Sequence, residues 1–282
     1  MIVMNLHGML GNQLFQYAYA MQLASEYHEK VVINTQFLPA NGNRIQEIGL
    51  QADYRQMKKN AAYFLCLLHA KTLSHAGRWF NVFFQTQRQM KKLPERLPKR
   101  CYIDGYWQGL PYVEKVIDPL VADLRKQLSS MGSEMCRALA EQMRAESNSV
   151  MLHIRRGDYL SNKGAQKLYC NIPLSYYEEA VTQLEKMVGR VSVYVFTNDK
   201  KWVRANLHLE ADMHIVDCDK HDYETLMLMA SCNHSIIANS TLSWWAAQMN
   251  ANEKKQVFAP RQWFVNEATN PHDLYPREWI KI

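Results

Sequence analysis

Short apolar runs and segments of helical period alternate along most of this 282-residue chain. At its start, an apolar run at residues 2–6 precedes a helical pattern at 10–24 and a second apolar run at 31–33. Gly8 and Gly11 lie where the first apolar run connects to the helical pattern, as is typical of a turn. The opening therefore predicts a strand, a glycine turn, a helix and a second strand.

Beyond residue 147 the alternation becomes regular. Apolar runs that predict strands occur at 149–154, 191–197, 214–216, 235–238 and 256–259. Helical patterns separate them. One carries the capping box Ser175-x-x-Glu178 and has Gly189 beyond its end, and another is expected to start at Asp222. Between about 50 and 100 the pattern is helical without strand alternation, so we expect helices there.

Strands that alternate with helices predict parallel sheets covered by helices. The simplest α/β architecture for this length is two Rossmann-like halves that face each other. The polar stretch around 140–148 suits the boundary between them.

Composition narrows the class of protein. Hydrophobic residues make up 48% and charged residues 21%, which excludes disorder and coiled coil. The apolar runs are too short to span a membrane, and the first residues lack the basic and apolar regions of a signal peptide, which predicts a cytoplasmic protein. The six cysteines are too far apart for C-x-x-C pairs, so we interpret them as reduced thiols.

The net charge of +6 is concentrated locally. Residues 55–100 contain eleven Lys and Arg but a single acid, Glu95, with aromatic residues interleaved. This pattern predicts peripheral contact with an anionic membrane, for which a solvated helical face is the alternative. Neither a stacking signature nor a helix-turn-helix supports binding of nucleic acid.

The first candidate site is the glycine turn Gly8-Met9-Leu10-Gly11-Asn12-Gln13. It follows a strand and opens a helix, so its backbone N–H groups could meet an anion or a polar ligand. It is not a dinucleotide fingerprint, because the next strand ends in Asn34 and not in an acid. A purely structural turn is the alternative.

The second candidate site follows the apolar strand at 149–154. It delivers Arg155, Arg156 and Asp158 at the carboxyl end, where parallel sheets bind ligands. His153 and Arg155 should share one face of the strand. The planar guanidinium fork matches phosphate oxygens, so two arginines could neutralise a diphosphate. A surface ion pair between Arg156 and Asp158 is the alternative.

Polar residues also follow two later strands. Asp199 could accept hydrogen bonds from a guanine edge, and Asn239, Ser240 and Thr241 open a helix whose hydroxyls could cap it or bind phosphate. A competing signal is the D-x-D pattern of Asp217 and Asp219, which in some glycosyltransferases holds a divalent metal.

Four motifs taken together resemble the alpha-1,2-fucosyltransferases of glycosyltransferase family 11. They occur in the family's order and cover nearly the whole chain: Gly8-x-x-Gly11-Asn12-Gln13-Leu14-Phe15-Gln16, Gly105-Tyr106-Trp107-Gln108, His153-x-Arg155-Arg156-Gly157-Asp158-Tyr159 and Asn239-Ser240-Thr241-x-Ser243-Trp244-Trp245-Ala246.

The resemblance implies a GT-B fold, with an acceptor-side domain at 1–145 and a GDP-fucose-binding domain at 146–282. By position, Arg155 and Arg156 would neutralise the diphosphate and His153 would orient them. Similarity to other fucosyltransferases implies that Asp199 reads guanine and that Ser240 and Thr241, after Asn239, line the phosphate side. The turn containing Gly8, Gly11, Asn12 and Gln13 would face the sugar and the acceptor.

The implied reaction is the inverting, metal-independent transfer of L-fucose from GDP-fucose, without a cofactor, to the 2-hydroxyl of a terminal beta-galactoside. The acceptor would belong to a bacterial surface glycan such as O-antigen, lipid-linked at the inner face of the membrane. Asp158 is the candidate base, with His7 and His153 as alternatives. The rival functions are a metal-dependent transferase that uses Asp217 and Asp219, and a non-catalytic module that binds glycans or anions.

Overall fold

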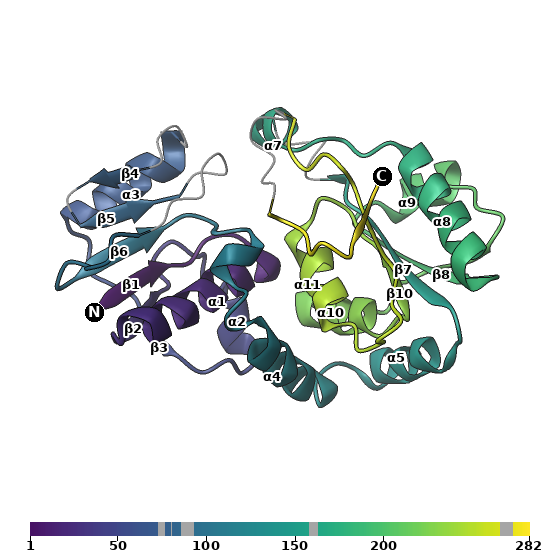
Figure 1. Cartoon of the computed structure of the whole chain (residues 1–282), viewed down its shortest axis with the longest axis horizontal. Coiled ribbons are helices and arrows are strands. Elements are labelled where there is room, and N and C mark those ends of the chain that lie inside the picture. Colours follow the sequence, from purple (N-terminus) through teal and green to yellow (C-terminus); the bar gives the residue numbers. More distant parts are fainter. Residues whose placement is uncertain (73–76, 80, 86–92, 158–162, 266–272) are drawn as a thin grey trace. The chain divides into compact units, whose positions relative to one another are not determined.

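A computed structural model of the chain describes residues 1–72, 77–79, 81–85, 93–157, 163–265 and 273–282. The chain divides into two compact units, Met1–Asp123 with Ala268–Leu274 and Leu124–Glu267 with Tyr275–Ile282. Each unit contains a six-stranded sheet with helices (Figure 1). The predicted α/β class, with two Rossmann-like domains, is confirmed.

The first unit opens with the predicted strand, helix and strand. Its elements are β1 (Ile2–Asn5), α1 (Leu10–Tyr27), β2 (Val31–Asn34), α2 (Arg44–Glu47), β3 (Asp53–Arg55), α3 (Ala61–Thr72), β4 (Gly77–Trp79), β5 (Val82–Phe84), β6 (Cys101–Asp104) and the 3-10 helix η1 (Leu110–Tyr112). The strand order is β3-β2-β1-β6-β5-β4, parallel throughout except for the antiparallel pair β4–β5.

The expectation of helices alone between 50 and 100 was wrong. Helix α3 is present, but β3, β4 and β5 are strands in the same region. Each has only three residues, which is too short to show a period of two. Pairing with longer neighbours, such as β5 on β6, makes them strands, and this pairing is tertiary.

The division between the units falls inside α4 (Ile117–Ser129). The second unit then contains α5 (Glu134–Ala145), β7 (Ser149–Ile154), α7 (Lys163–Leu168), α8 (Leu174–Val188), β8 (Ser192–Thr197), α9 (Lys200–Asn206), β9 (Asp212–Ile215), α10 (Asp222–Ala230), β10 (His234–Ile236), α11 (Thr241–Met249), β11 (Val257–Ala259) and β12 (Ile280–Lys281). Its strand order, β12-β11-β10-β7-β8-β9, is parallel at every pairing.

The unit boundary lies earlier than the predicted one between residues 145 and 146. The polar stretch that suggested the later boundary is largely the exposed side of α5. That helix buries Cys136, Ala140 and Met143 within the second unit, and Arg144 donates a 2.7 Å hydrogen bond to Ser231 Oγ. A surface helix is mostly polar in sequence, so its polarity looked like a linker.

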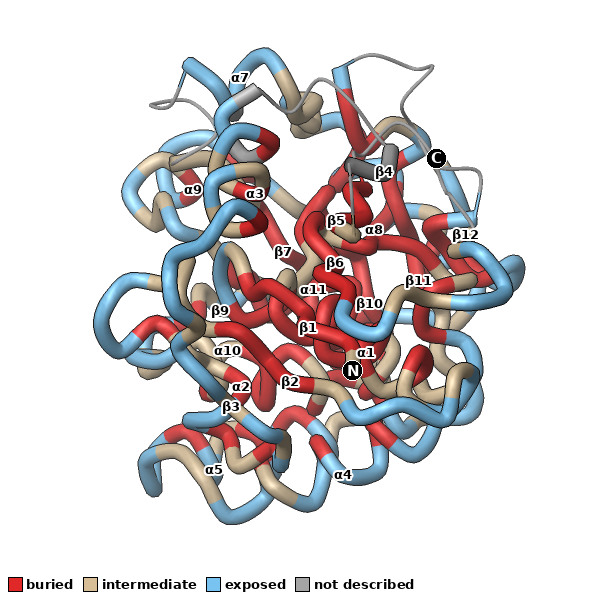
Figure 2. The backbone as a smooth tube through the Cα atoms, turned by 90° about the vertical axis from the view of Figure 1, so that its left-hand side faces the viewer, coloured by how far each residue is buried: buried red, intermediate tan, exposed pale blue. Residues whose placement is uncertain are grey.

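The central strands form the buried part of each unit. All six residues of β7 are buried, because helices cover both faces of a parallel sheet (Figure 2). On one face, β7 and β8 pack against Tyr177, Ala180 and Leu184 of α8. In the first unit, Val3 of β1 and Tyr102 of β6 pack against Cys66 of α3.

Helix ends follow the sequence signals in part. Helix α10 starts at Asp222, and Gly189 at φ 87° ends α8, as predicted. The predicted capping box is absent, because Pro173 is the N-cap of α8 and Ser175 lies inside its first turn. Among the described helices, none is long and apolar enough to cross a membrane.

Candidate functional site

The carboxyl edge of the second sheet collects most of the predicted site residues. The strand order reverses between β7 and β10, which makes this position a topological switch point. Arg155 follows β7, Asn198 follows β8 and Asn239 follows β10. Because all three strands are parallel, these residues emerge at the same edge of the sheet.

Asn198 holds the loop that carries the arginines. Its Oδ1 accepts the backbone N–H of Arg156 at 3.0 Å and that of Gly157 at 3.2 Å. A Cβ atom on Gly157 would lie 3.0 Å from Asn198 Nδ2, so the close approach favours glycine. Asn198 was not among the predicted site residues, although its place directly after a strand is a usable signal.

The side chains of Arg156 and Asp199 contact each other. Arg156 Nε lies 3.8 Å from Asp199 Oδ2, and the guanidinium carbon lies 3.5 Å from the ring centre of Trp202. The other carboxylate oxygen of Asp199 accepts the backbone N–H of Trp202 at 3.1 Å and caps α9. The groups predicted to bind diphosphate and guanine thus form an ion pair stacked on an aromatic ring. Trp202 was not predicted, although it lies in the first turn after Asp199.

The remaining predicted residues of this unit differ in exposure. His153 is buried in β7, whereas Arg155 is half-buried beyond the strand end. Ser240 is the N-cap of α11 without a side-chain cap, and Thr241 is the first residue of that helix. Asp158, the predicted base, lies outside the described residues.

The side chain of Asn239 is hydrogen-bonded to the backbone of two other segments. Only 1% of it is exposed, and its Nδ2 donates to the carbonyl oxygens of Cys170 at 2.7 Å and Trp263 at 3.0 Å. It therefore joins three segments at the sheet edge: the start of α11, the residues after α7 and the residues after β11.

We expect Asn239→Ala to lower the free energy of unfolding by about 2–3 kcal/mol, because two carbonyl oxygens lose their donor. Urea unfolding followed by circular dichroism measures the change. Asn206→Ala is the control, since Asn206 makes an exposed bond to Trp202 O in α9. Equal, small effects for both variants would contradict this role of Asn239.

Both carboxylates of the D-x-D pattern lie near the ammonium group of Lys200. Lys200 Nζ lies 2.5 Å from Asp217 Oδ1 and 3.9 Å from Asp219 Oδ1. The hydrogen bond from Lys200 lowers the pKa of Asp217, while burial raises that of Asp219. A metal ion at these carboxylates would have to displace the ammonium group. Within the part of the chain that the structure describes, no group of three or more His, Cys, Asp or Glu side chains could hold a metal ion.

In the first unit, the predicted glycine turn is an organising centre. Gly8 has φ 74°, and Gly11 is buried in the first turn of α1. Gln13 Nε2 donates to the carbonyl oxygens of Gly8 at 2.9 Å and Gly42 at 2.7 Å, and its Oε1 accepts the N–H of Arg44. The amide of Gln13, predicted to bind substrate, therefore fixes the backbone around the turn.

This turn is bound to the Gly105–Gln108 motif. Gln108 Nε2 donates to Asn12 Oδ1 at 2.9 Å, and Gln16 Nε2 donates to Gly105 O at 2.9 Å. Two motifs that are far apart in the sequence thus form one hydrogen-bonded structure. Beside it lies Asp104, a residue that the sequence analysis did not select.

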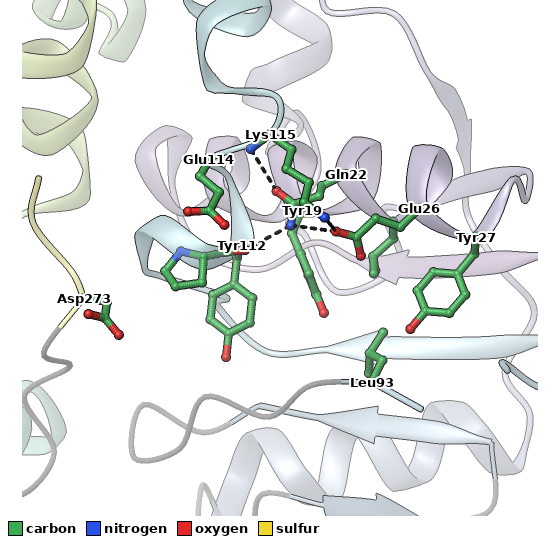
Figure 3. Close-up of a pocket in the computed structure, with 11 residues that line it drawn as sticks. Tyr19, Gln22, Glu26, Tyr27, Leu93, Tyr112, Glu114, Lys115 and Asp273 are labelled. Carbon is green, nitrogen blue, oxygen red and sulfur yellow. Dashed lines mark hydrogen bonds and ion pairs between the residues drawn. The ribbon is translucent and has the colours of Figure 1, made fainter. Parts of the chain in front are cut away.

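A separate pocket of about 600 Å³ opens in the first unit (Figure 3). Figure 3 shows Gln22 and Lys115 pointing at Glu26, to which their nitrogens lie at 3.2 and 2.7 Å. The lining is aromatic and acidic: Tyr19, Gln22, Leu23, Glu26, Tyr27, Leu93, Pro111, Tyr112, Glu114, Lys115 and Asp273. None of the predicted site residues that the structure describes lines this pocket.

Two Rossmann-like units, each with a switch point at the carboxyl edge of its sheet, give the chain a fold of the GT-B type. The model of the protein family described as Glycosyl transferase family 11 matches residues 1–282 of the chain. The chain therefore belongs to glycosyltransferase family 11, and the predicted family resemblance is confirmed.

Known proteins similar to the chain agree with this assignment. The O-antigen biosynthesis glycosyltransferase WbnK of Escherichia coli is 26% identical over 98% of this chain and 99% of its own length. The alpha-1,2-colitosyltransferase of Escherichia coli is 24% identical over 100% and 98%.

Solved structures of fucosyltransferases are also similar to the chain. NodZ from Bradyrhizobium matches with a TM-score of 0.45 and 12% identity over 87% of this chain and 90% of its own. POFUT1 in complex with GDP-fucose matches with a TM-score of 0.45 and 12% identity over 92% and 97%.

Proposed function

We propose that this glycosyltransferase moves L-fucose from GDP-fucose to the 2-hydroxyl of a terminal beta-galactoside, with inversion at the sugar carbon and without a metal. The acceptor is a bacterial surface glycan such as O-antigen. The observation that carries the proposal is the loop of Arg155 and Arg156, held by Asn198 at the switch point of the second sheet in a family 11 chain.

The chemistry suits this loop. When the bond between the sugar and the phosphate breaks, negative charge builds on the departing nucleoside diphosphate. Fixed guanidinium groups stabilise this charge more in the transition state than in the ground state. Asn198 fixes the backbone of the loop before substrate binds, so little reorganisation is needed.

Metal independence has separate support. The carboxylates of the D-x-D pattern already face Lys200, which supplies their positive partner within the protein. The rival hypothesis, a metal-dependent transferase, would require Asp217 to exchange this ammonium group for a metal ion. We therefore assign Asp217 and Asp219 to an ion-pair network that also includes Arg204.

The relatives guide the choice of donor and acceptor. One is named as an O-antigen glycosyltransferase and the other as an alpha-1,2-colitosyltransferase. Colitose lacks the 3-hydroxyl of fucose, so GDP-colitose is the donor to compare with GDP-fucose.

Peripheral contact with anionic lipid stays a prediction. The exposed Lys58 and Lys59 belong to its basic segment, whereas residues 86–92 lie outside the described part.

The test measures GDP release from GDP-fucose in EDTA, with lactose and galactosyl-N-acetylhexosamines as acceptors. We expect turnover that depends on the acceptor, and a product whose NMR spectrum shows an alpha-1,2 linkage. Turnover that appears only after manganese is added would support the metal-dependent alternative. Faster turnover with GDP-colitose would reassign the donor, and binding without GDP release would support the non-catalytic module.

A further inference from the structure

The first sheet has a switch point of its own, and a histidine and an aspartate meet there. The strand order reverses between β1 and β6. His7 follows the carboxyl end of β1, and Asp104 is the last residue of β6. Ligands of open α/β sheets bind outside the carboxyl ends of the strands at such a position.

The two side chains are hydrogen-bonded. His7 Nε2 lies 3.1 Å from Asp104 Oδ1, and Asn5 Nδ2 donates to Asp104 Oδ2 at 3.0 Å. Asp104 is 1% exposed, whereas 14% of the His7 side chain is exposed. The carboxylate is therefore enclosed, and the imidazole lies between it and the surroundings.

The titratable neighbours keep this carboxylate ionised. Burial raises the pKa of Asp104, but the nearby ring of His69, whose Nδ1 lies 3.6 Å from Oδ1, and the hydrogen bond with His7 outweigh burial and hold that pKa below its ordinary value. Burial and the Asp104 charge raise the pKa of the Cys66 thiol and of the Tyr106 hydroxyl, so both stay neutral. Asp104 is thus the anionic centre of the cluster.

This arrangement selects one form of the His7 ring. A carboxylate only accepts hydrogen bonds, so Nε2 carries a hydrogen, and in the neutral ring Nδ1 then has the lone pair. No partner for Nδ1 occurs in the described ranges of the chain. The ring lies 4.9 Å from the Phe37 ring and 6.4 Å from that of Tyr106. Aromatic surfaces of this kind suit the apolar face of a sugar.

We propose that His7 is the proton acceptor of the transfer reaction and that Asp104 is its positioning residue, an inference that rests on the proposed function. The acceptor hydroxyl oxygen forms a bond to the anomeric carbon of the donor sugar, and its proton moves to His7 Nδ1. The bond from that carbon to the phosphate oxygen breaks, and the nucleoside diphosphate leaves with the electron pair. His7 thereby takes the role that the sequence analysis gave first to Asp158.

The variant His7→Gln tests the assignment. The glutamine amide can still donate to Asp104 but cannot accept a proton. We expect kcat for transfer to fall about 10²-fold or more. His28→Asn is the control, since His28 is exposed at the end of α1 in the left-handed conformation that asparagine tolerates.

The variant Asp104→Asn separates positioning from folding. An asparagine amide would donate to Nε2 and move the ring hydrogen to Nδ1, so transfer should fall while the melting temperature changes little. In ¹⁵N-histidine spectra, the His7 signals should report hydrogen on Nε2 in wild type and on Nδ1 in the variant. Unlike kcat, these spectra require no turnover.

The outcomes separate the two proposals. If wild type transfers fucose but His7→Gln transfers it equally well, His7 is not the base, whereas the proposed function stands. If wild type does not transfer with any donor, the proposed function fails. The spectra then test the roles proposed for His7 and Asp104. Hydrogen on Nδ1 of wild-type His7, or no change in the His7 signals on adding lactose, would overturn these roles.

Discussion

Replacing Arg155 with alanine is expected to lower kcat/KM for transfer by about 10³-fold, the upper range for loss of one donor to a developing anion. Arg155 directly follows β7 at the switch point, and its planar guanidinium fork matches phosphate oxygens. We therefore expect it to stabilise the negative charge on the leaving diphosphate. GDP release with a saturating acceptor measures the loss.

Two further variants identify the cause of this loss. Arg155→Lys keeps the charge but loses the planar fork, so we expect a smaller decrease of about 10-fold to 30-fold. Arg190→Ala removes an exposed arginine from the same unit and should leave the rate unchanged. Equal rates for Arg155→Ala and Arg190→Ala would contradict a role of Arg155 in catalysis.

Gly105→Ala is expected to destabilise the protein by about 3 kcal/mol, through backbone strain and a steric clash. Gly105 has φ 136°, and a Cβ atom there would lie 2.5 Å from the carbonyl oxygen of Gln85. The carbonyl oxygen of Gly105 also accepts the hydrogen bond from Gln16 Nε2, and Gly105 directly follows Asp104 in the sequence. Movement of this segment should therefore lower transfer as well as the free energy of unfolding in urea.

Gly189→Ala is the matched control for Gly105→Ala. Gly189 has φ 87°, but a Cβ atom there would meet nothing within 4 Å. We expect Gly189→Ala to cost only the backbone strain, about 1–3 kcal/mol, without the added cost of a steric clash. If both variants lose the same stability, the contact with Gln85 is not what requires glycine at position 105.

The elements of the second unit were largely predictable from the sequence. Its buried parallel strands are continuous apolar runs, and residues 149–154 were assigned in full. The strands of the first unit between 50 and 100 were not, because three-residue segments carry no measurable period. Their conformation depends on pairing with β2 and β6, which no local window contains.

The candidate site shows the same division. The place of Arg155 at a strand end was predictable, since the end of an apolar run marks it. The partners of Arg156 were not. The short separation in sequence suggests Asp158 as an ion-pair partner, whereas the structure pairs Arg156 with Asp199 and Trp202. The register of β7 beside β8 brings these segments together.

Local periodicity and contiguous motifs already indicate the fold class, the family and the strand ends from which the candidate site residues emerge. Which side chains meet depends on the packing of segments that are far apart in the chain. His7 and Asp104 are 97 residues apart, and parallel pairing of β1 with β6 places them 3.1 Å from each other. Burial of Asp104 in that contact decides its ionisation and the orientation of the histidine, and burial is a property of the packed chain.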